Sequence, residues 1–71
     1  MDNAVLVSLR ILVSTLAESK ALDEASLASI RTAFREAGAS FYERGDDEGG
    51  RDLVDLSLWT FGALRRVRAA G

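Results

Sequence analysis

The side chains that most often carry catalysis and metal binding are missing from this sequence, which contains neither histidine nor cysteine. Serine and threonine hydroxyls are present, but a hydroxyl needs a neighbouring base before it can act as a nucleophile. The only lysine, Lys20, falls where we expect a turn between helices. None of the 11 carboxylates lies in an apolar stripe, where burial would raise its pKa toward neutrality. We therefore predict a protein that is not an enzyme, with no catalytic residues and no cofactor.

Carboxylates gather in one place, the segment 45–50, which reads Gly-Asp-Asp-Glu-Gly-Gly. Oxygen ligands of this kind suit hard divalent cations. The spacing is not that of a twelve-residue calcium loop, and no distal glutamate stands where it would bind the ion with both oxygens. We interpret segment 45–50 as a solvated loop and predict no metal site.

The composition predicts a folded, helical chain. Apolar residues make up 48% of it, charged residues 28%, and proline is absent, which together favour long helices. A chain of 71 residues buries only a small core, and without disulfides or a metal the usual remaining source of stability is assembly with another subunit. We predict a single all-α domain over 1–71. Its expected form is a small antiparallel three-helix bundle, or a helical hairpin plus a third helix, completed by oligomerisation.

Capping residues and apolar periodicity place the helices at about 3–19, 23–44 and 51–69. Asp2 or Asn3 can cap the first helix, and Asp23 the second. Short connections between long helices favour antiparallel neighbours. One apolar stripe on each helix is assigned to the core. The first helix contributes Val5, Leu6, Leu9, Leu12, Val13 and Leu16, the second Leu27, Ile30, Phe34, Ala37 and Phe41, and the third Leu53, Leu56, Thr60, Ala63, Leu64 and Val67.

Large apolar residues remain after the core has been assigned, mainly on the third helix. Val54, Leu58 and Phe61 form a second stripe there, roughly 120° from the core stripe. A smaller patch remains on the first helix. The alternative explanation is that the helix phase is misjudged and that one wide stripe serves the core. We favour a surface that a partner covers, because tryptophan and arginine, which stand beside these residues, are enriched at interaction hot spots. The predicted contact residues are Val54, Leu58, Trp59, Phe61, Arg65 and Arg66 on the third helix and Val7 and Ile11 on the first.

This surplus predicts a non-catalytic protein–protein interaction module, such as a small regulator, adaptor or inhibitor that occludes or bridges a partner surface. A structural homodimer or an accessory subunit of a larger complex is the alternative, and a second copy is the simplest partner because two-fold homodimers are the commonest assembly. A small dimeric DNA-binding regulator is less favoured. Arg31 and Arg35 lie one turn apart, but the net charge is −2, and Asp52 and Asp55 would face phosphates from the start of the third helix.

The apolar run 4–17 does not indicate a membrane protein. It is too short to span a bilayer, Arg10 interrupts it, and Asp2 stands where a secretion signal would carry a basic residue. A helix that lies on a membrane carries a strongly basic face, and this one offers only Arg10. We expect a cytoplasmic protein. Every basic residue except Lys20 is arginine, which we interpret as the codon bias of a GC-rich bacterial or phage genome.

Overall fold

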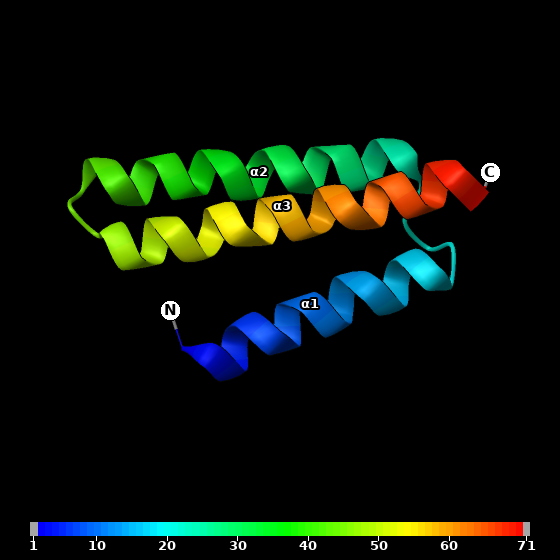
Figure 1. Ribbon diagram of the computed structural model, residues 1–71, viewed down its shortest axis with the longest axis horizontal. Helices are drawn as coiled ribbons and strands as arrows, with labels where there is room; N and C mark the ends of the chain where they lie inside the picture. The colour runs from blue at the N-terminus through cyan, green and yellow to red at the C-terminus, as the bar shows by residue number, and fades with distance from the viewer. Residues whose placement is uncertain (1, 71) are drawn as a thin grey trace.

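The computed structural model describes residues 2–70, which form three α-helices and, within that range, no strand (Figure 1). Helix α1 spans Asn3–Glu18, α2 spans Glu24–Glu43 and α3 spans Asp47–Ala70. The prediction of an all-α fold is confirmed. None of these helices is both long and apolar enough to cross a bilayer.

Helix α1 is closed at both ends by local hydrogen bonds. At its start the carboxylate of Asp2 accepts a 2.8 Å hydrogen bond from the backbone N–H of Ala4. At its end the N–H groups of Lys20 and Ala21 donate to the carbonyls of Ala17 and Leu16, at 3.1 and 3.0 Å. This is the Schellman arrangement, in which glycine normally takes the left-handed position. Here Lys20 takes it, with φ 63°, at a backbone cost of about 1–2 kcal/mol.

Helix α2 begins at the predicted cap. The carboxylate of Asp23 accepts a 2.8 Å hydrogen bond from the backbone N–H of Ser26. That hydrogen bond favours the ionised carboxylate, so it holds the pKa of Asp23 below its ordinary value. The helix ends at Glu43, and Gly45, with φ 85°, turns the chain back toward α3.

Helix α3 begins at Asp47, earlier than predicted, so the expectation of a loop over 45–50 is wrong for residues 47–50. Asp46 accepts a 2.9 Å hydrogen bond from the N–H of Gly49 and so starts the helix. Gly49 and Gly50 are buried because they lie against the end of α2. A Cβ atom at Gly49 would come within 2.5 Å of the Phe41 ring. These glycines therefore allow helix contact, and they are not a flexible linker.

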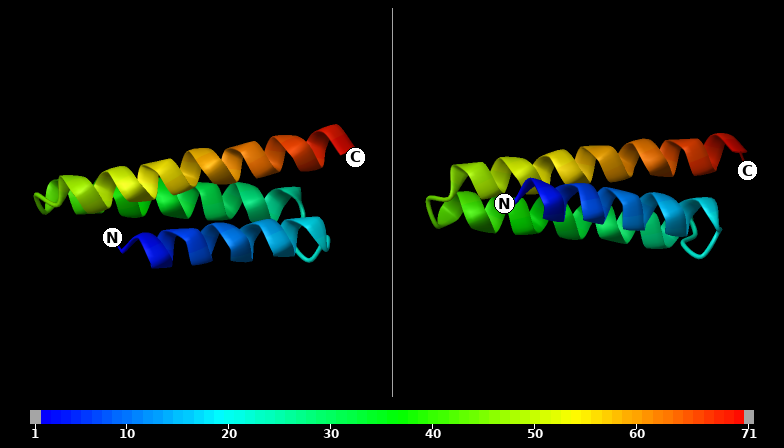
Figure 2. Two further views of the ribbon diagram at one scale, coloured as in Figure 1. Left: turned by 60° about the horizontal axis from the view of Figure 1, so that its bottom comes forward. Right: turned by 90° about the horizontal axis from the view of Figure 1, so that it is seen from below.

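Helices α2 and α3 are antiparallel and stay side by side along nearly their whole length (Figure 2). Gly38 is buried in their contact, where a Cβ atom would lie 3.0 Å from the Gly50 carbonyl oxygen and 3.1 Å from Val54 Cγ2. The predicted core stripe of α3 is largely confirmed, because all but its last member are buried: Leu53, Leu56, Thr60, Ala63 and Leu64. The buried Thr60 hydroxyl donates to the Leu56 carbonyl at 2.8 Å, so it is satisfied within the helix.

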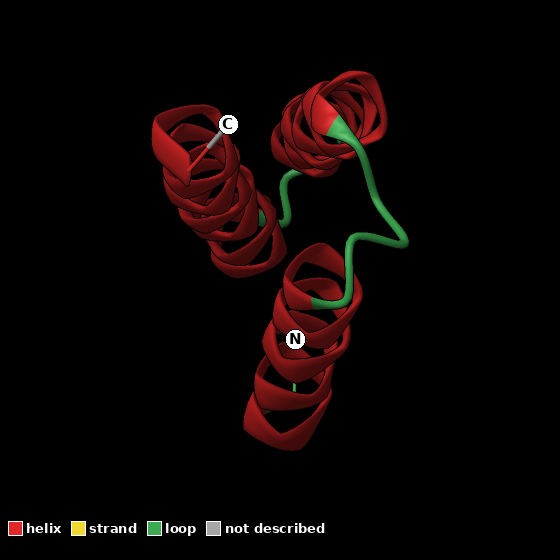
Figure 3. Ribbon diagram, turned by 90° about the vertical axis from the view of Figure 1, so that its right-hand side faces the viewer, coloured by secondary structure: helices red, strands yellow, loops and turns green. Residues whose placement is uncertain are grey.

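Helix α1 lies against α3, runs in the same direction, and diverges from the hairpin toward its N-terminus (Figure 1). Seen from the end, the three helices stand at the corners of a triangle (Figure 3). The contact between α1 and α3 is much smaller than that between α2 and α3, and Val13 is the one buried residue of α1. The core stripe predicted for α1 is therefore wrong at Val5 and Leu12. Both side chains are exposed, because α1 makes only a small contact with the hairpin and no neighbouring helix covers them.

Candidate interaction surface

The structure uses two of the predicted contact residues of α3 inside the chain. Trp59 and Phe61 are half-buried and pack against the core cluster formed by Val13, Leu27 and Leu64. Phe61 also faces α2, where the guanidinium carbon of Arg31 lies 4.9 Å from the centre of its ring. The side chains of Trp59 and Phe61 therefore stabilise the fold of the single chain.

Only part of the second stripe of α3 is left for a partner. Val54 is half-buried beside Gly38, whereas Leu58 is 63% exposed, and Arg65 and Arg66 are exposed. The close approach of α2 at Gly38 explains why Val54 is half-buried, because a Cβ atom at Gly38 would lie only 3.1 Å from Val54 Cγ2. A sequence pattern gives the direction of a side chain but not the separation of two helices.

The largest gathering of exposed apolar side chains lies on α1. Val5, Val7, Ile11 and Leu12 are 47%, 42%, 60% and 55% exposed, and we call these four residues the α1 surface. Val7 and Ile11 were predicted to contact a partner, and Val5 and Leu12 join them from the predicted core. At 100° per residue, Val5 and Leu12 lie on one side of the exposed arc and Val7 and Ile11 on the other. Small residues occupy the arc between them: Ala4, Ser8 and Thr15.

The electrostatics of α1 explain part of its loose attachment. Arg10 is the only charged residue inside the helix before Glu18, and it lies one turn before Val13 on the side that faces the hairpin. Its Nε atom is buried, with no hydrogen-bond partner among the described residues. A buried donor left without an acceptor costs about 1–3 kcal/mol. The face of α1 that packs on α3 thus contains a polar atom without a hydrogen-bond partner. The exposed face has no charged residue near the middle of the helix.

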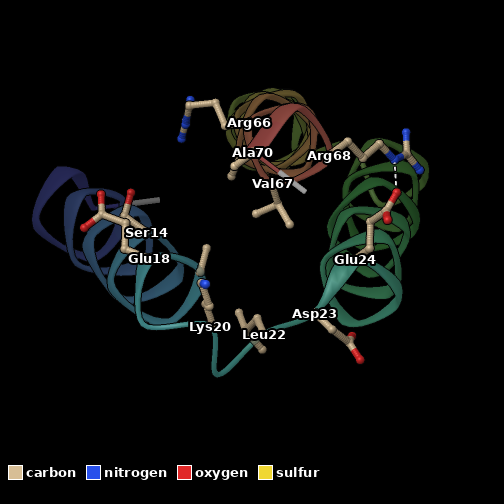
Figure 4. A pocket seen from close by; sticks show the side chains of 12 residues that line it. Ser14, Glu18, Lys20, Leu22, Asp23, Glu24, Arg66, Val67, Arg68 and Ala70 are labelled. Atoms are coloured by element: carbon tan, nitrogen blue, oxygen red, sulfur yellow. Dashed lines mark hydrogen bonds and ion pairs between the residues drawn. The ribbon is translucent and has the colours of Figure 1, made fainter.

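A cleft of about 880 Å³ lies between the helices at the C-terminal end of α1, away from the α1 surface (Figure 4). We call it the end cleft. Its walls come from the last turns of α1 and α3, the connection between α1 and α2, and the start of α2. The apolar lining residues are Ala17, Leu22, Ala63, Val67 and Ala70, and the polar ones are Ser14, Glu18, Lys20, Asp23, Glu24, Arg66 and Arg68. Within residues 2–70, no three acidic, histidine or cysteine side chains are grouped so that they could hold a metal ion.

Comparison of the chain with protein-family models, with curated proteins and with solved structures finds no match.

Proposed function

We propose that this chain is a non-catalytic protein–protein interaction module, a small regulator, adaptor or inhibitor, and that the α1 surface is its main contact. The observation that carries this proposal is the exposure of four large aliphatic side chains on one short helix that is only partly packed against its own chain. Leu58 and Arg65 on α3 offer a smaller, separate contact.

Covering the α1 surface would contribute a favourable free energy of about the same size as the minimum cost of association. Complete burial of an aliphatic side chain contributes about 1.5–3 kcal/mol, and each of these four is about half exposed, so covering all of them contributes about 3–6 kcal/mol. Association itself costs at least about 4 kcal/mol. The α1 surface alone therefore supports weak binding, and a stable complex requires the partner to contact its flanks as well.

A second copy of the chain is the simplest partner that fits this requirement. Two copies related by a two-fold axis would bury the α1 surface twice, which doubles the apolar contribution for one association cost. We accordingly propose that oligomerisation completes the three-helix arrangement, and that a different protein with an apolar groove is the alternative partner.

The experiment is sedimentation velocity over a concentration series with the natural chain and with Ile11→Asp. The exposed position of Ile11 leaves the fold intact, so far-UV circular dichroism of the variant is expected to match the natural chain. Self-association is expected in the natural chain and is expected to be lost in the variant. Ala39→Asp, which places the same charge on the exposed side of α2, is the matched control and should associate normally.

If the natural chain stays monomeric at all concentrations, the same variants are used as baits for proteins from the source cell. A partner that the natural chain and Ala39→Asp retain and Ile11→Asp loses supports the alternative partner. Identical capture by the natural chain and both variants, together with a monomeric natural chain, would remove the α1 surface from consideration.

A further inference from the structure

The end cleft combines an apolar interior with one inward-pointing charge. Leu22 from the connection and Val67 from α3 both point into it, and Lys20 lines it from the side of α1 (Figure 4). The cleft is within the size range of pockets that hold small organic molecules. A ligand that fits this lining is largely apolar, with one polar group at the end that meets Lys20.

The backbone of Lys20 has an unusual conformation for a residue with a side chain. It occupies the left-handed position of the Schellman turn that ends α1, a position at which glycine would be free of strain. A residue other than glycine in this conformation carries a backbone cost, which makes Lys20 a candidate for a functional side chain. The turn presents the Lys20 ammonium group to the cleft, and no ion pair within residues 2–70 involves it.

The anionic side chains around the end cleft do not neutralise this ammonium group. Glu24 forms an ion pair with Arg68 across the start of α2 and the end of α3. Asp23 caps α2, and its carboxylate points away from the cleft. Glu18 also points outward, on the far side of α1 (Figure 4).

Arg66 lies on the same outer rim, between α1 and α3, and its guanidinium group points away from the interior as well (Figure 4). The interior of the cleft therefore has a positive charge at one end and an apolar lining beyond it.

We propose that the end cleft binds an aliphatic carboxylate, with the hydrocarbon chain against the apolar lining and the carboxylate paired with the Lys20 ammonium group. The carboxylate supplies the negative charge that the chain itself does not provide there. The apolar lining contacts the hydrocarbon chain of the ligand, and each methylene that it buries contributes to binding through the hydrophobic effect. This site is separate from the α1 surface, and the proposal does not depend on the proposed function.

The test is isothermal titration calorimetry of the full chain with decanoate below its micelle concentration, with decanol as the neutral ligand of equal length. Saturable binding of decanoate, and at least tenfold weaker binding of decanol, are expected. Lys20→Met is expected to weaken decanoate binding at least tenfold and to leave decanol unchanged. Arg35→Met, which removes an exposed charge from α2 outside the cleft, is the matched control and should bind decanoate normally.

Lys20→Gly separates the ligand role from a structural one. Glycine relieves the left-handed backbone, so this variant is expected to melt about 5 °C higher than the natural chain while losing decanoate binding. The proposal is overturned if the natural chain gives no saturable heat with decanoate, or if Lys20→Met binds decanoate as tightly as the natural chain. Ile11→Asp, which disrupts the α1 surface, should bind decanoate normally, so failure of one proposal does not imply failure of the other.

Discussion

Replacing Gly38 by alanine is expected to destabilise the protein, even though alanine is the better helix former. A Cβ atom at this position would lie 3.0 Å from the Gly50 carbonyl oxygen, 3.1 Å from Val54 Cγ2 and 3.4 Å from Leu53 Cβ. None of these atoms is the end of a long side chain that could rotate away, so α2 and α3 must move apart. Overpacking of this kind costs about 1–3 kcal/mol, which outweighs the gain in helix propensity of about 0.5–1 kcal/mol. The expected net loss is about 1 kcal/mol.

Gly62→Ala is the matched control for Gly38→Ala. Gly62 is also inside a helix, but a Cβ atom there would meet only Arg66 Nη1, at 3.9 Å. The propensity gain of about 0.5–1 kcal/mol is then not opposed, so this variant is expected to be more stable than the natural chain. For a chain of this size, 1 kcal/mol corresponds to about 4–8 °C in melting temperature, so the two variants should differ by about 10 °C.

The assay is thermal and urea unfolding followed by far-UV circular dichroism, which gives the free energy of unfolding of each variant. The order expected is Gly62→Ala above the natural chain and Gly38→Ala below it. If Gly38→Ala were as stable as Gly62→Ala, the two helices could not be in the close contact that the structure shows, and the explanation given for the burial of Val54 would fail with it.

The other predictions concern the core, one cap and one ion pair. Leu56→Ala should lower the free energy of unfolding by about 2–5 kcal/mol in urea titrations, whereas Leu12→Ala should cost less than about 1 kcal/mol, because Leu56 is fully buried and Leu12 is exposed; equal losses would contradict the position of α1. Because the folded pKa of Asp23 is lowered, its contribution to stability is present at neutral pH and is lost as the pH falls through that folded value. Asp23→Asn should therefore flatten the acid side of a plot of melting temperature against pH, and an unchanged plot would argue against the cap. Removing the ion pair between Arg68 and Glu24 by Glu24→Gln should change stability by less than about 1 kcal/mol, since both side chains are about half exposed; a larger loss in denaturant titration would show that the pair is better shielded than its exposure indicates.

The features that could be predicted from sequence are those that local chemistry determines. Asp23 was identified as a cap from its position before an apolar period, and the α3 core stripe followed from spacing alone. Segment 47–50 was misassigned because glycine pairs usually mark loops, and nothing local shows that Gly49 and Gly50 lie against another helix.

The predicted interaction residues depended on distances between helices, which no pattern within one helix provides. Trp59 and Phe61 looked surplus because the sequence does not show how close α2 comes to α3 or where α1 ends. The exposure of Leu12 was missed for the opposite reason, since its stripe is regular but the neighbour that would cover it is too far away. Lys20 was placed in a turn, but its left-handed backbone and its direction into the end cleft required coordinates.

Helix α1 is attached less firmly than α2 and α3 are to each other, so local unfolding of α1 requires less free energy than unfolding of the α2–α3 hairpin. Helices α2 and α3 share a long interface, whereas α1 is held mainly near Val13 and Ala17, so it can detach in a fluctuation that leaves the hairpin intact. Amide hydrogens of α1 will then exchange with solvent faster than those in the middle of α3. Each such opening uncovers the same strip of α3 in every copy. In a concentrated solution α1 of one molecule can close on the hairpin of another, and this domain exchange reproduces every contact of the single chain.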